Sequence, residues 1–264
     1  MKEEKKRSLE GCSEAREMPE KENAPAFPAH TCVDCRVMAC CGGTGKSYPP
    51  FCLTEKMDPA LIEKAMAEYK KPDINRIAVS AAEVEADYYC RLTRVEETMK
   101  FAEKIGARRI GIATCVGLLR EAGTAAQIFR AHGFEVFGAA CKCGAQKKVD
   151  IGIPKRCEWV DPNMCNPVLQ AMTLNREKTD LDVMIGLCVG HDSLFLKYAE
   201  APVTVLVVKD RVLGNNPAAA LYTADSYYGR LLHPEKEPGK TAGGGRAEEL
   251  PENESAGSEP EGGK

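Results

Sequence analysis

The fold class is clearest in residues 109–140, which read RIGIATCVGLLREAGTAAQIFRAHGFEVFGAA. A short apolar run over 109–114 is followed by a helical pattern from Leu118 to about Ala131. A second apolar run, 134–140, comes directly after Gly133. This change of period predicts a strand, a helix and a second strand. Strands that are joined through a helix lie parallel in one sheet, with a right-handed crossover.

Two further apolar runs extend this pattern toward the C-terminus. One covers 181–187 and follows a helix announced by Asn166 and Pro167, and the other covers 203–208 and follows a short helix over 192–198. Apolar strands that alternate with helices are typical of a parallel sheet with both faces covered. We therefore predict an α/β fold, a small Rossmann-like layer of about four parallel strands flanked by helices.

The residues before 109 are expected to be helical. Asp58 followed by Pro59 is a typical helix start. The stretch 73–88 contains the strand-like letters IAVS, but its apolar residues recur at helical spacing, which favours a helix. A third helix begins at a capping box of Thr93 and Glu96 and ends at Gly106. An N-terminal helical segment thus precedes the sheet.

Length and composition divide the 264 residues into four regions. With 44% hydrophobic residues, the chain can bury the core of one large domain or two small ones. We expect a disordered arm at 1–29 and a disordered tail at 233–264, because both are charged and lack apolar periodicity. Between them we expect a cysteine-rich knuckle at 30–57, which forms one compact unit with a helical segment and α/β domain at 58–232.

Charge and hydropathy exclude two classes of partner. The net charge of −3 lacks the basic excess of a nucleic-acid surface. The strongly apolar stretch at 203–208 is far too short to cross a bilayer, and no apolar segment of a signal peptide follows the start MKEEKKRSLE. We therefore expect a cytoplasmic protein that binds neither nucleic acid nor a membrane.

Thirteen cysteines are the chemically most informative feature of the composition. In a reducing cytoplasm, cysteines in such number point to metal ligation or thiol chemistry rather than to disulfides. In a local cluster two residues separate Cys32 from Cys35, and Cys40 and Cys52 are available to complete a four-cysteine site. Cys41 could replace Cys40 as a ligand, and His30 is close enough in sequence to compete.

A second cysteine set is distributed over the predicted sheet. Cys115, Cys141 and Cys188 each follow an apolar run, and Cys165 precedes the helix start at Asn166. Because the carboxyl ends of parallel strands share one edge, these thiols are expected to converge there. Four thiolates suit Zn²⁺ or an iron–sulfur cluster, although a buried cysteine can also act simply as a small apolar side chain.

Two other patterns at this edge leave the activity open. Cys188 is followed closely by His191 and Asp192, so a thiol-dependent redox or transfer enzyme could use Cys188 or Cys115 with His191. The simpler interpretation makes Asp192 a helix cap and lets His191 support a metal-bound sulfur or face solvent. The charged residues Lys209, Asp210 and Arg211 end the fourth strand at the same edge, and they could meet a small anionic ligand or pair with one another. A solvated loop with a helix cap is the favoured interpretation.

Several stretches together resemble the domain of unknown function 1847 family, over residues 30 to 232: CVDCRVMACC, the FC at 51 and 52, RRIGIATCVGLLREA, FGAACK, PNMCNP and IGLCVGHDSLFLKYAEAPVTVLVVKDRVLGNNP. Members of that family are described as metal-binding proteins of anaerobic bacteria and archaea. The resemblance implies a cysteine-ligated metal and names no reaction. It carries over onto eight cysteines: Cys32, Cys35, Cys40, Cys52, Cys115, Cys141, Cys165 and Cys188. The remaining cysteines of the core region, Cys41, Cys90, Cys143 and Cys157, do not match.

The leading hypothesis is a metal-binding protein with a four-cysteine knuckle and a second cysteine-ligated site, for zinc or an iron–sulfur cluster, at the carboxyl edge of the sheet. The thiol enzyme is the main alternative. A metallochaperone or regulator that works through protein contacts is a third hypothesis.

Overall fold

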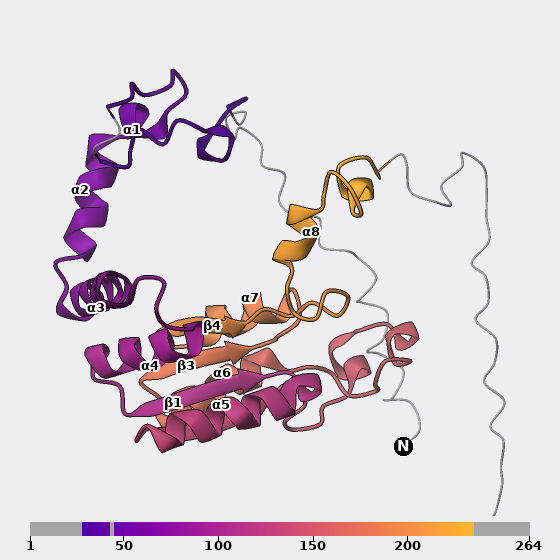
Figure 1. The fold of residues 1–264 in the computed structure, drawn as a ribbon. Coiled ribbons are helices and arrows are strands. Elements are labelled where there is room, and N and C mark those ends of the chain that lie inside the picture. Colours follow the sequence, from indigo (N-terminus) through magenta and orange to yellow (C-terminus); the bar gives the residue numbers. More distant parts are fainter. Residues whose placement is uncertain (1–27, 43–44, 235–264) are drawn as a thin grey trace, which may run out of the picture. The chain divides into compact units, whose positions relative to one another are not determined.

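The computed structural model describes residues 28–42 and 45–234 (Figure 1). Its contacts divide the chain into two compact units, Met1–Asp210 and Arg211–Lys264. The arm expected at 1–29 and the tail expected at 233–264 lie outside the described residues, apart from two residues each. The second unit contains a short helix, α8 (Ala218–Tyr222), and a 3-10 turn at Gly229–Leu231.

The first unit is built on a four-stranded sheet in which all neighbouring strands are parallel. The strands are β1 (Arg109–Thr114), β2 (Glu135–Ala140), β3 (Leu181–Ile185) and β4 (Val203–Val207). They lie in the order β2-β1-β3-β4. The α/β fold with four parallel strands is thereby confirmed.

Helices precede the sheet and connect its strands. Their bounds are α1 (Leu53–Lys56), α2 (Pro59–Glu68), α3 (Pro72–Tyr88), α4 (Arg94–Ile105), α5 (Leu119–Ala131), α6 (Pro167–Glu177) and α7 (His191–Tyr198). Short 3-10 turns lie at Cys32–Asp34, Val116–Leu118, Lys148–Ile151 and Lys155–Cys157. None of the described helices combines the length and apolar composition needed to span a bilayer.

The caps expected from the sequence form the helix ends. The Asp58 carboxylate accepts from Ala60 N at 2.9 Å and starts α2. Thr93 and Glu96 form the predicted capping box at the start of α4, where Thr93 N donates to the Glu96 carboxylate at 2.8 Å. Such caps satisfy backbone N–H groups that have no partner within the helix. The stretch 73–88 is helical, as its spacing predicted.

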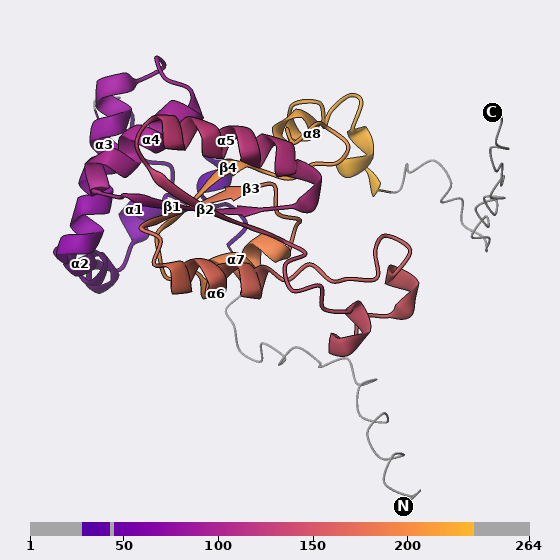
Figure 2. The same ribbon diagram turned by 90° about the horizontal axis from the view of Figure 1, so that it is seen from below.

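The two faces of the sheet are covered by different helices, as Figure 2 shows. One core cluster joins α4 and α5 to β1 and β3, with Phe129 and Ile110 fully buried in it. The other joins α6 and α7 to the opposite face around Leu174 and Phe195. By contrast, none of the ten residues of α2 is buried, so its apolar stripe lies on the surface. Burial of both faces explains why the strands are continuously apolar.

A buried carboxylate interrupts the apolar run of β3. Asp182 of β3 is fully buried and accepts a hydrogen bond from Thr179 Oγ1 at 2.7 Å. It lies beside Gly111 of β1, where an added Cβ would be 2.2 Å from the Asp182 carboxylate. A glycine is therefore needed at 111 because the neighbouring strand fills the space that a side chain would take.

Candidate functional site

The strand order reverses direction between β1 and β3. From β1 the chain continues to β2 on one side, and then returns to β3 and β4 on the other side. In open parallel sheets, ligands bind beyond the carboxyl ends of the strands at such a switch point, because the connections diverge there to opposite faces. The carboxyl ends of β1 and β3 are therefore the expected place for a site.

Four cysteines from separate segments lie at this edge. Cys115 follows β1 directly, Cys141 follows β2 directly, and Cys165 precedes Asn166, the residue that caps α6. Cys188 lies three residues beyond the end of β3, because the strand ends at Ile185 rather than at residue 187. Cys115 and Cys141 are buried, with 8% and 2% of their surface exposed, and the other two are partly exposed. We call these four residues the thiol cluster.

Backbone hydrogen bonds hold the segments of the thiol cluster together. Cys141 N donates to Thr114 O at 2.8 Å, and Cys115 N donates to Ile185 O at 3.3 Å. Asn166 N donates to Cys141 O at 2.7 Å, which fixes the residue after Cys165 beside the end of β2. The Gln170 side chain of α6 adds a buried link, since its Nε2 donates to Thr114 O at 3.0 Å and to Ala139 O at 2.7 Å.

The thiols interact with one another as a chain. Hydrogen bonding to Cys141, together with burial, raises the pKa of Cys115 to about 12. The pKa of Cys141 is also raised: its hydrogen bond with Cys115 lowers it, but the hydrogen bond with Cys165 and burial outweigh this effect. Hydrogen bonding from Cys141 and the nearby Lys142 charge lower the pKa of Cys165 to about 7. Cys188 is close enough for its charge to oppose ionisation of Cys165.

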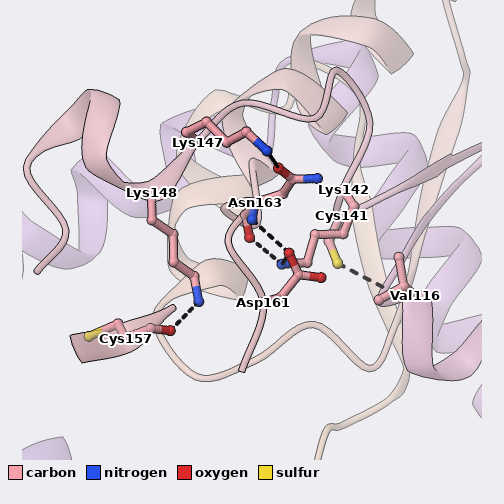
Figure 3. A network of polar contacts seen from close by, with 8 residues as sticks. All are labelled: Val116, Cys141, Lys142, Lys147, Lys148, Cys157, Asp161 and Asn163. Carbon is pink, nitrogen blue, oxygen red and sulfur yellow. Dashed lines mark hydrogen bonds and ion pairs between the residues drawn. The ribbon is translucent and has the colours of Figure 1, made fainter. Parts of the chain in front are cut away.

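Polar contacts hold together the loop between β2 and α6, which leads to Cys165; Figure 3 shows these contacts. Lys142 forms an ion pair with Asp161 at 3.5 Å and donates to the backbone oxygen of Asn163. Lys147 donates to the Asn163 side chain at 2.8 Å, and these contacts tie the start of the loop to its end. The Val116 N–H, in the 3-10 turn that follows β1, lies 3.5 Å from Cys141 Sγ. The loop therefore returns Cys165 to the neighbourhood of Cys141.

A lysine completes the described surroundings of the thiol cluster. Lys209 Nζ lies 3.4 Å from Cys115 Sγ and donates to it. Lys209 lies in the loop after β4, as expected, but its side chain is half-buried and directed to a buried thiol rather than to solvent. The sequence places the residues after the fourth strand at this edge, but it does not show that this lysine reaches Cys115.

The His191 neighbourhood differs from the expected arrangement. We expected Asp192 or Ser193 to be the N-cap, but α7 begins at His191 with Gly190 in the cap position. The positive φ of Gly190, 85°, explains the difference, because a glycine adopts it without strain. The Asp192 carboxylate still accepts from Gly190 N at 2.9 Å and from Ser193 N at 2.8 Å. His191 N donates to Cys188 O at 2.9 Å.

The knuckle thiols are more exposed than the thiol cluster. Cys32 and Cys40 are exposed, and Cys35 and Cys52 are partly exposed. Cys41 is exposed as well, and His30 contacts the Phe51 ring at a centroid distance of 5.6 Å. Across residues 28–42 and 45–234, no three or more His, Cys, Asp and Glu side chains are arranged to hold a metal ion. The ligands of the knuckle and of the thiol cluster therefore both stay a prediction.

Comparison with known proteins places the chain in a family. A family described as "Protein of unknown function (DUF1847)" matches residues 52–206, which include the whole thiol cluster and Cys52. An uncharacterized protein of Methanocaldococcus jannaschii, MJ0455, is 45% identical over 173 residues, which cover 65% of this chain and 88% of the relative. The chain therefore belongs to the DUF1847 family of proteins of unknown function.

Proposed function

We propose that the chain is a metal-binding protein whose thiol cluster, Cys115, Cys141, Cys165 and Cys188, holds zinc or an iron–sulfur cluster. The observation that carries this proposal is the convergence of four thiols from four segments at the switch point of the sheet. Neighbouring members already interact through hydrogen bonds between Cys115, Cys141 and Cys165. Four soft donors are the ligand set that zinc and iron–sulfur clusters take.

Metal binding would displace the protons of the thiols. A thiol must lose its proton to ligate, so metal binding would replace the chain of thiol hydrogen bonds by metal–sulfur bonds. Cys115, whose pKa is raised to about 12, keeps its proton in the metal-free protein, so the bound cation would have to displace it. A bound metal would supply a fixed positive charge, and the four side chains would anchor α5, α6 and α7 to the edge of the sheet.

Metal analysis of the full chain, purified without oxygen, tests the proposal. We expect bound zinc, or bound iron with the visible absorption of an iron–sulfur cluster. Replacing Cys141 by Ser should remove the metal that the thiol cluster binds and leave the metal of the knuckle. A matched variant in which Cys90, Cys143 and Cys157 are all Ser should keep the metal of both sites, because these cysteines lie outside the proposed sites. Equal metal content in the wild type and Cys141→Ser, with both proteins folded, would overturn the proposal.

The four-cysteine knuckle of Cys32, Cys35, Cys40 and Cys52 remains part of the proposal as a second, structural site. Its support is the spacing of the first two cysteines and the soft donor set. Replacing all four by Ser should remove a further equivalent of metal and leave the thiol cluster loaded. We retain the cytoplasm as the proposed compartment, because a reducing environment keeps so many thiols free.

A thiol-dependent redox or transfer enzyme is the second candidate, and the low pKa of one thiol favours it. With a pKa of about 7, Cys165 is a thiolate in a large fraction of molecules at neutral pH. The sequence offered Cys188 or Cys115 as the nucleophile. Of these, Cys115 has a pKa of about 12, so it is protonated at neutral pH and poorly suited to the role. Alkylation of the metal-free protein distinguishes the candidates: a catalytic thiol should react, and its modification should abolish a screened activity.

A further inference from the structure

Lys209 is placed unusually for a lysine that follows an edge strand. Its side chain is half-buried, and Nζ donates to Cys115 Sγ at 3.4 Å. Within the part of the chain that the structure describes, its ammonium group forms no ion pair. Removing an ammonium group from water costs free energy unless an anion or a strong acceptor compensates for it. A negative charge beside Lys209 would offset this cost, and the thiol cluster is the group that its ammonium touches.

The side chain reaches Cys115 by crossing the end of a strand. Lys209 follows β4 and Cys115 follows β1, while β3 lies between these two strands. Gly186 is the first residue after β3, and a Cβ there would lie 1.9 Å from Leu118 Cδ1 and 3.7 Å from Lys209 Cδ. The missing side chain at 186 thus leaves the space that Leu118 occupies, and the lysine stem packs beside this turn.

A second glycine lies beside the ammonium group. A Cβ on Gly117 would lie 3.5 Å from Lys209 Nζ and 3.9 Å from Cys115 Sγ, which is ordinary van der Waals contact. Gly117 and Gly186 lie in the turns that follow β1 and β3, so the lysine side chain packs along both turns to reach the sulfur.

The proposed metal site would supply the negative charge that offsets the partial burial of the Lys209 ammonium group. Four thiolates around a divalent metal carry a net charge of −2, and the same net charge results for four thiolates on a cluster core of charge +2. An N–H donor to a metal-bound sulfur stabilises the negative charge on that sulfur. Groups outside the ligand sphere that act in this way typically contribute 10- to 100-fold to metal affinity.

We propose that Lys209 is a positioning residue of the thiol cluster, which donates a hydrogen bond to metal-bound Cys115 and offsets part of the negative charge of the four-thiolate site. This inference rests on the proposed function. It assigns the site a dianionic metal–thiolate centre, and it adds a residue outside the 52–206 family match.

The test uses the full chain in which the four knuckle cysteines, Cys32, Cys35, Cys40 and Cys52, are Ser, so that only the thiol cluster binds metal. Co²⁺ is the probe, because its sulfur-to-metal charge-transfer absorption reports thiolate ligation directly. Competition with a chelator gives the dissociation constant. The variants are Lys209→Met, which keeps the stem and removes the charge, and Lys209→Arg, which keeps the charge and donors. Lys197→Met, on the exposed side of α7, is the matched control.

We expect Lys209→Met to weaken Co²⁺ binding by about 10- to 100-fold, and to shift the charge-transfer band to lower energy because the sulfur loses a hydrogen bond. Lys209→Arg should restore most of the affinity, and Lys197→Met should match the parent. A structural role alone would leave the band energy unchanged. If the parent binds Co²⁺ and Lys209→Met binds it with equal affinity and an unshifted band, the inference is wrong. If the parent binds no Co²⁺, the proposed function fails first.

Discussion

Replacing Asp182 by Asn should change how the stability of the protein depends on pH. Asp182 is fully buried in β3, and one of its carboxylate oxygens has no hydrogen-bond partner among the described residues. Burial raises its pKa to about 6, although the hydrogen bond from Thr179 opposes the shift. The carboxyl group is thus stable in the interior as a neutral acid, and its charged form is unfavourable there.

The magnitude follows from the pKa of the same group in the unfolded chain, which is 3.8. A rise of about two pKa units corresponds to about 3 kcal/mol between the two protonation states. Because the folded-state pKa is raised, the stability contributed by the neutral acid is fully present below about pH 4, and it is lost as the pH rises through about 6. Between these limits the folded protein binds more protons than the unfolded chain, so stability falls with pH.

Urea denaturation of the wild type and Asp182→Asn at a series of pH values from 4 to 7.5 measures this effect. We expect the difference in unfolding free energy between the two proteins to shift by about 3 kcal/mol in favour of the variant across this range. Glu200→Gln, which removes an exposed carboxylate, should show little such shift. A difference between wild type and Asp182→Asn that stays constant with pH would refute the reasoning.

Two further predictions concern the sheet and the thiols. Gly111→Ala should destabilise the fold by about 1 to 3 kcal/mol, because a Cβ there would lie 2.2 Å from the Asp182 carboxylate; Gly138→Ala, whose Cβ would have no neighbour closer than 3.9 Å, is the control, and equal urea midpoints for the two variants would contradict the packing described. In the metal-free protein, Cys165 should be alkylated well before Cys115 at pH 7, because the pKa values of their thiols are about 7 and about 12. Peptide mass spectrometry after timed exposure to iodoacetamide measures the order, and faster labelling of Cys115 would contradict the prediction.

Much of the fold was predictable because local signals and the global topology agree. The apolar runs predicted all four strands, and the caps at Asp58, Thr93 and Asn166 predicted helix starts. The third strand was predicted two residues too long. The run stays apolar through Leu187, but Gly186 has a φ of 65° and ends the ladder at residue 185. An apolar pattern does not reveal a backbone turn of this kind.

The thiol cluster could be located from the sequence because the carboxyl ends of parallel strands share one edge. The contacts of Lys209 could not, since they depend on the strand order and on how its side chain packs against the turns after β1 and β3. The links from Lys142 and Gln170 depend likewise on how a loop and a helix return to the sheet. The exposure of the apolar face of α2 could not be predicted either. Amphipathic spacing predicts a helix, but it does not reveal what the apolar face of that helix contacts.

The most direct test of the central claim uses the full chain in which the four knuckle cysteines are replaced by Ser. X-ray absorption spectroscopy at the absorption edge of its bound metal identifies the atoms that ligate the metal. If Cys115, Cys141, Cys165 and Cys188 form one site, the first shell should contain only sulfur, at about 2.3 Å for zinc. Adding Cys141→Ser should remove the bound metal or replace one sulfur. A first shell of oxygen and nitrogen, or a folded protein that retains no metal under anaerobic conditions, would contradict the claim that these four thiols form a metal site.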